Sequence, residues 1–68
     1  MSDENSLKES IVRELSGKKL TFEELARALS WSGDRRPLRK ALADLVREGR
    51  VLRVPDYDRR RMVFTAAQ

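Results

Sequence analysis

Two groups of basic side chains are the residues of this chain whose types and spacing best suit a specific chemistry. The first group comprises Arg35, Arg36, Arg39, Lys40 and Arg47, and the second is the run Arg59, Arg60 and Arg61. Arginine presents a planar fork of N–H donors that fits phosphate oxygens and guanine edges, and it stays charged at physiological pH. We therefore expect both groups to bind a polyanion.

Charge is divided unequally between the two halves of the 68-residue chain, whose net charge is +4. Residues 1–34 hold five lysines and arginines against seven acidic residues, a formal charge of −2. Residues 35–68 hold ten against four, a formal charge of +6, and nine of these ten are arginine. Such a one-sided distribution is the electrostatic pattern expected of a nucleic-acid binder.

The composition argues against catalysis. The chain has no cysteine and no histidine, which removes the thiolate ligand and nucleophile, the commonest general base and the commonest metal ligand. Its three glycines are scattered, so no phosphate-binding loop is formed. We expect no enzyme activity, no cofactor, no metal and no small-molecule ligand. A single small domain without a membrane segment is predicted, located in the cytoplasm at the nucleoid, or in the nucleus of a eukaryote.

The first basic group must be positioned by a helix over residues 34–49. Its apolar residues Leu38, Ala41, Leu42, Leu45 and Val46 have the spacing of one buried helical stripe. The opposite face carries Arg36, Lys40, Ala43 and Arg47, where the small alanine allows close approach to a surface. We expect Asp34 to cap this helix, Pro37 to occupy its first turn and Gly49 to end it.

Two earlier helices are predicted by capping boxes. Ser6 and Glu9 form the first Ser-x-x-Glu pair, so we expect residues 1–6 to be a disordered tail and the domain to span residues 7–65. Gly17 should end that helix, and residues 18–20 could add a short strand. Thr21 and Glu24 form the second capping box, which predicts a helix from Phe22. Trp31, in the following turn, is expected to fill the small core.

The second basic group must be positioned by a β-hairpin. Residues 50–54 and 62–65 are rich in β-branched and apolar residues, and Pro55 is expected to end the first strand. Asp56 and Asp58 are typical turn residues, and Tyr57 is expected to lean on the hairpin. The pattern leaves open whether Arg53 or Val54 points toward the interior. Residues 66–68 are expected to be loose.

The segments LTFEELARAL and DRRPLRKALADLVREGRV, in this order of elements, resemble a winged helix-turn-helix domain. The resemblance covers about Leu7 to Thr65 and implies an α+β fold with three helices and a C-terminal β-hairpin wing. It implies that the third helix enters the DNA major groove and that a wing at 55–61 contacts the neighbouring minor groove or backbone. The site it implies comprises Arg35, Arg36, Arg39, Lys40, Arg47, Arg59, Arg60, Arg61 and Thr21, the last offering its amide to a phosphate.

Double-stranded DNA is therefore the expected partner, and transcription regulation or chromatin association the expected role. Two other functions stay open: a protein-interaction (adaptor) module, and an RNA-linked accessory domain of a larger assembly. A homodimer is also possible, although no dimerisation helix follows the wing. The basic helix face could equally be an ordinary solvated surface in which Asp44 simply pairs with Lys40.

Overall fold

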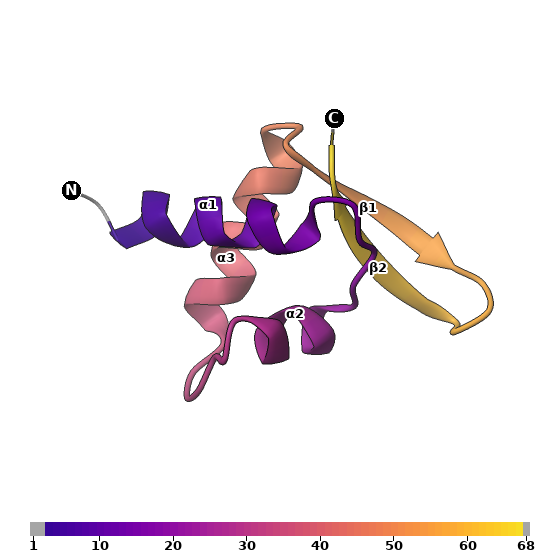
Figure 1. The fold of residues 1–68 in the computed structure, drawn as a ribbon, viewed down its shortest axis with the longest axis horizontal. Helices are drawn as coiled ribbons and strands as arrows, with labels where there is room; N and C mark the ends of the chain where they lie inside the picture. The colour runs from indigo at the N-terminus through magenta and orange to yellow at the C-terminus, as the bar shows by residue number, and fades with distance from the viewer. Residues whose placement is uncertain (1–2, 68) are drawn as a thin grey trace.

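The computed structural model describes the backbone of residues 3–67 and the side chains of residues 5–67. Within this range the chain forms three helices followed by an antiparallel two-stranded hairpin, so the α+β class is confirmed. The elements are α1 (Asp3–Leu15), α2 (Phe22–Ala28), α3 (Arg36–Arg47), β1 (Val51–Asp56) and β2 (Arg61–Ala66). The helices group together, and the hairpin extends away from them to the side opposite the N-terminus (Figure 1).

Helix α1 begins earlier than its sequence predicts. It starts at Asp3, so Ser6 and Glu9 lie inside it and the predicted capping box at these residues is wrong. Serine and glutamate are both tolerated within a helix, which is why a Ser-x-x-Glu pair does not by itself mark a helix start. Residues 1–2 of the predicted tail lie outside the described residues, and residues 3–6 are helical. Gly17, at φ +72°, ends the helix as expected.

Helix α2 begins as predicted, with a complete capping box. The Thr21 hydroxyl accepts a hydrogen bond from the Glu24 N–H (3.1 Å), and the Glu24 carboxylate accepts one from the Thr21 N–H (2.9 Å). Two of the amide groups that a helix start would leave without partners are thereby satisfied. Leu20, the residue just before this cap, forms a β-bridge with Phe64 of β2. This bridge fixes the position of α2 relative to the hairpin.

Helix α3 is shorter than the predicted span of 34–49. Arg35, and not the predicted Asp34, occupies the N-cap position. The Asp34 carboxylate lies one residue before it and accepts a hydrogen bond from the Arg36 N–H (3.0 Å). The Trp31 indole N–H donates to the Asp34 carbonyl oxygen (2.9 Å), and its ring packs half-buried against the core. Trp31 therefore closes the turn between α2 and α3 as well as contributing to the core. Gly49, at φ +78°, follows the helix as expected.

The hairpin pairs Val51 with Ala66 at its base and Asp56 with Arg61 at its tip. Pro55 lies within β1 instead of ending it, because β1 is an edge strand of this sheet, where a missing N–H is tolerated. The predicted third strand is reduced to one bridge, in which Leu20 and Phe64 exchange hydrogen bonds of 3.0 and 2.7 Å. This bridge ties the segment before α2 to β2.

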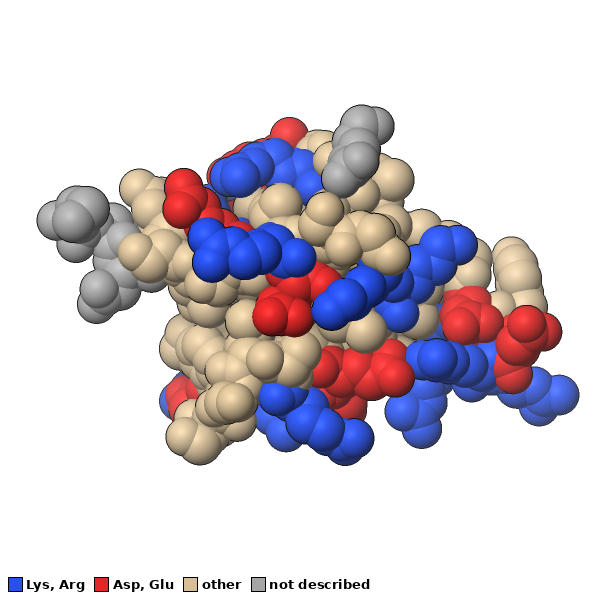
Figure 2. All heavy atoms as spheres, in the orientation of Figure 1, with Lys and Arg blue, Asp and Glu red and all other residues tan. Residues whose placement is uncertain are grey.

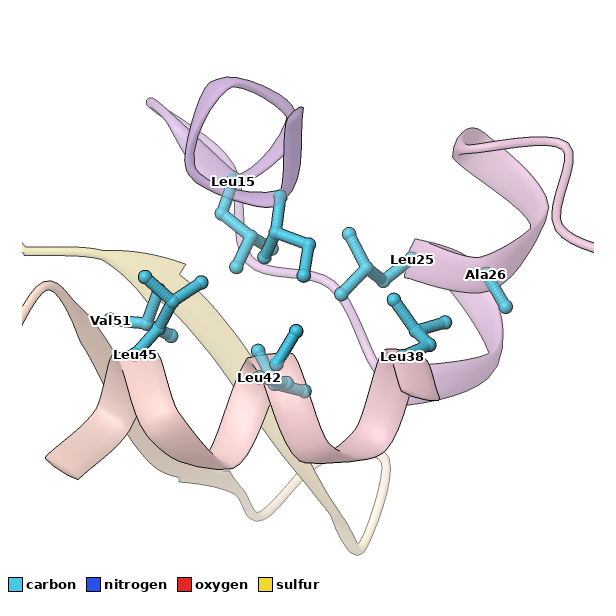
Figure 3. Close-up of a cluster of buried hydrophobic side chains, with 9 residues drawn as sticks. Leu15, Leu25, Ala26, Leu38, Leu42, Leu45 and Val51 are labelled. Carbon is cyan, nitrogen blue, oxygen red and sulfur yellow. The ribbon is translucent and has the colours of Figure 1, made fainter. Parts of the chain in front are cut away.

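The core lies where the three helices and the base of the hairpin meet. One side of α3 presents Leu38, Leu42 and Leu45 toward Leu15 of α1 and Leu25 of α2 (Figure 3). All five are at most 3% exposed. The predicted stripe of α3 is thereby confirmed, which leaves the opposite side of the helix to solvent. No helix among residues 3–67 combines the length and the apolar character needed to cross a bilayer.

Candidate nucleic-acid interface

The outward face of α3 carries cations that lack carboxylate partners. Arg39, Lys40 and Arg47 are exposed, and none of them forms an ion pair with any side chain in residues 5–67. Ala43 is exposed between them. Lys40, Ala43 and Arg47 lie on the face opposite the buried leucines, as the helical spacing predicts, and Arg39 lies beside that face, over the Phe22 ring.

The acidic residues of α3 are held on another side by α1. The Lys8 ammonium lies 2.9 Å from a Glu48 carboxylate oxygen and 4.0 Å from one of Asp44. Asp44 therefore does not pair with Lys40, which was the competing interpretation of this helix face. The single Lys8 charge offsets part of the charge of these two carboxylates, which weakens their effect on the positive potential along the outward face of α3.

The first two arginines of the group are engaged at the start of α3. Arg35 is half-buried and forms a hydrogen-bonded ion pair with Glu23 of α2. Arg36 is exposed, and its guanidinium pairs with Asp34 at 2.8 Å. The Arg35–Glu23 pair joins the start of α3 to α2, whereas the Arg36–Asp34 pair is local to the start of α3. The sequence-predicted site thus divides into Arg39, Lys40 and Arg47, which lack such partners, and Arg35 and Arg36, which have them.

The three arginines at the hairpin tip also fall into an ion-paired group and a group without ion pairs. Arg59 pairs with Glu24 of α2 at 2.8 Å and with Asp56 at 3.6 Å, which connects the wing to the helices. Arg60 and Arg61 are exposed and form no ion pair within the described side chains. The Asp56 carboxylate accepts hydrogen bonds from the N–H groups of Asp58 (3.1 Å) and Arg59 (3.3 Å), the turn role expected of it.

Tyr57 and Thr21 also differ from expectation. Tyr57 is 84% exposed at the hairpin tip, so the prediction that it leans on the hairpin is wrong. Thr21 is 6% exposed, and both its hydroxyl and its N–H are used by the capping box with Glu24. The Thr21 amide therefore has a carboxylate partner of its own, in the place where the resemblance implied a phosphate.

The acidic start of α2 is held in its charged form by these contacts. The Arg35 guanidinium hydrogen-bonded to Glu23 lowers the pKa of that carboxyl below its ordinary value. The Thr21 N–H lowers the pKa of the Glu24 carboxyl, and the Arg59 guanidinium lowers it further. Two separate ion pairs, Glu23–Arg35 and Glu24–Arg59, thus join α2 to the start of α3 and to the hairpin.

A groove between α3 and the hairpin contains a cation that sequence reasoning did not assign to the site. Its volume is about 520 Å³, and Arg53 of β1 lies on its wall across from Arg39 and Arg47. Its apolar lining comprises Phe22, Leu42, Ala43, Val46 and Phe64. Arg53 pairs with Phe64 across the hairpin. The alternation of side chains along β1 predicts this pairing only if the strand register is known, and the sequence left open whether Arg53 or Val54 points inward.

The surface charge is not a single uniform patch. On the face seen in Figure 2, Lys and Arg side chains are interleaved with Asp and Glu, including at the hairpin end. The candidate cations that form no ion pair within the described part of the chain are Arg39, Lys40, Arg47, Arg53, Arg60 and Arg61. Of these, Arg61 lies close enough to Glu23 for its charge to help lower the pKa of that carboxyl.

Comparison with protein families, with curated proteins and with solved structures finds no match for this chain. The candidate site is therefore argued from its own residues and geometry.

Proposed function

We propose that this chain is a winged helix-turn-helix protein that binds double-stranded DNA, as a transcription regulator or a chromatin-associated factor. The order of elements supports this: three helices, a bridge between Leu20 and β2, and a hairpin directly after α3. In this arrangement α3 enters the major groove, and the tip of the hairpin reaches the minor groove or the adjacent backbone.

The observation that carries the proposal is the set of uncompensated cations on α3. Arg39, Lys40 and Arg47 are exposed without carboxylate partners in the described residues, while Lys8 engages Asp44 and Glu48. Like charges gathered on one surface repel each other, and phosphates on a duplex relieve that repulsion. Phosphate contacts then provide most of the affinity, and an arginine fork at Arg39 can read a guanine edge.

Salt dependence gives the first test. Arg39, Lys40, Arg47, Arg60 and Arg61 are the proposed phosphate contacts, so the slope of log K against log salt should be about −4.5. Binding of a fluorescent duplex is measured by anisotropy over a salt series. A slope near zero would contradict the proposal.

Paired substitutions give the second test. Lys40→Ala with Arg47→Ala should weaken duplex binding, and Arg60→Ala with Arg61→Ala should weaken it independently. Arg13→Ala with Lys18→Ala, both on or next to α1, removes the same charge away from the proposed interface and is the matched control. Equal losses in all three double variants would show that only net charge matters.

Competition separates the other candidate functions. Duplex RNA and single strands are tested as competitors of the duplex DNA, and preference for either would favour the RNA-linked role. Among residues 5–67 only one aromatic side chain, Tyr57, is classed as exposed, whereas binding of single strands relies on several stacking residues, which supports the duplex. The adaptor function requires an exposed Trp31, whereas its ring packs half-buried against the core.

A further inference from the structure

The groove between α3 and the hairpin has a composition that duplex binding alone does not require. Phe22, Leu42, Val46 and Phe64 line it together with the small Ala43, and they come from α2, α3 and β2. The DNA phosphates that the cations of α3 are proposed to contact are polar and charged, so phosphate contacts do not explain an apolar floor of this kind. Apolar linings with a few polar groups are typical of sites for small organic molecules, and the volume of about 520 Å³ lies within their usual range.

Three guanidinium groups surround this floor. Arg39 and Arg47 are separated by two turns of α3, about 12 Å along the helix axis, and Arg53 faces them from β1. None of the three forms an ion pair with a side chain of residues 5–67. Arg39 stacks over the Phe22 ring, 5.3 Å from its centroid, which leaves the N–H edge of the guanidinium available to an acceptor.

We propose that this groove binds a small organic dianion with a flat aromatic body, such as an aromatic dicarboxylate. The ring covers Val46 and Phe64 beside the Arg39 guanidinium that lies over Phe22, and the two carboxylates pair with arginines at opposite ends of the groove. Charge complementarity selects the ligand, because three unpaired cations around one cavity disfavour a neutral or cationic occupant. A ligand here covers Arg39 and Arg47, so it competes with a duplex bound to α3.

This proposal differs from the sequence-based expectation that no small molecule is bound. The lining residues are dispersed over positions 22 to 64 and form no motif along the chain. It does not depend on DNA binding, because the ligand is tested on the protein alone.

The test is an NMR titration of the full chain with three probes: naphthalene-2,6-dicarboxylate, its uncharged diamide, and inorganic sulfate. We expect the dicarboxylate to shift the amide signals of residues lining the groove, and the other two to leave them unchanged at the same concentrations. Equal binding of the diamide would show that the charge is not needed, and equal binding of sulfate would show that the aromatic body is not needed. Either result would overturn the proposal. Absence of dicarboxylate binding would also overturn it.

Two variants with matched controls locate the site. Ala43→Leu fills the groove from an exposed helix position and should abolish dicarboxylate binding, whereas Ala28→Leu, also at an exposed helix position, should not. Arg53→Gln should weaken binding roughly fivefold, and Arg50→Gln, a neighbouring exposed arginine outside the groove, should have no effect. Loss of binding in a control as large as in its partner variant would contradict this location.

Discussion

At the scale of single residues, the partners of a charge decide whether that charge is available to a ligand. Arg36 and Lys40 both lie on the outward side of α3, yet the first pairs with Asp34 while the second has no carboxylate partner among the described residues. The sequence shows both as exposed basic residues four positions apart. Their difference arises because Lys8, from another helix, engages Asp44 and Glu48.

Under the proposed function, Lys8 should therefore influence duplex affinity without contacting the duplex. In Lys8→Gln the carboxylates of Asp44 and Glu48 lose their compensating charge and lower the potential at Lys40 and Arg47. We expect duplex affinity at low salt to fall roughly threefold, and the difference to shrink as salt screens these charges. Fluorescence anisotropy at two salt concentrations measures both effects.

The control for this prediction is Lys18→Gln. Lys18 lies just after α1 and is 3.9 Å from Glu14, so its loss changes the net charge equally at a different place. If both variants lose the same affinity, the compensation of α3 by Lys8 has no specific role.

At the scale of elements, the start of α2 shows how a local signal becomes a tertiary contact. The capping box of Thr21 and Glu24 is local, but the same Glu24 carboxylate also receives Arg59 from the wing, 35 residues later. The cap therefore orients the hairpin tip relative to the helices. It does so through a carboxylate that must stay charged to bind Arg59.

Stability should accordingly fall at acidic pH. Glu24 has a lowered pKa in the folded state, so its contribution is present above the pKa of the unfolded chain and is lost as the pH falls through the folded-state pKa. In Glu24→Gln the amide can still accept from the Thr21 N–H but no longer titrates, so the free energy of unfolding should depend less steeply on acidic pH. Urea denaturation over a pH series measures this slope.

Glu9→Gln, at an exposed position of α1, is the reference for this measurement. A Glu24→Gln variant with an unchanged slope would show that the cap does not contribute to the pH dependence.

At the scale of the whole molecule, stability rests on a small core at the meeting point of the helices and the hairpin. Leu45 is fully buried there, whereas Leu52 of β1 is 49% exposed. In a chain of this length a single hydrophobic core rarely supplies more than about 3–5 kcal/mol of net stability. One buried leucine is therefore a large part of what keeps the domain folded.

Leu45→Ala should cost about 2–5 kcal/mol and leave much of the protein unfolded at room temperature. Leu52→Ala, the same change at an exposed site, should alter stability by less than about 0.5 kcal/mol. Circular dichroism with urea titration checks both. Equal destabilisation by the two substitutions would contradict the location of the core.

The sequence by itself determined the three helices, the hairpin and the face of α3 that is buried. Helical periodicity, the Thr21–Glu24 capping box and Gly49 are local signals, so they act within a few residues and could be read without the fold. Local patterns that fit more than one structure gave wrong predictions. Ser6 lies inside α1 and does not cap it, and Pro55 lies within β1 and does not end it.

Only the tertiary structure decided which cations are available and what surrounds them. The pairs Lys8–Glu48 and Arg59–Glu24 join residues 40 and 35 positions apart, and the groove brings Arg53 to face α3. Ion pairing and packing depend on distance in space, and residues far apart in the chain are brought within a few ångströms only by the packing of the elements.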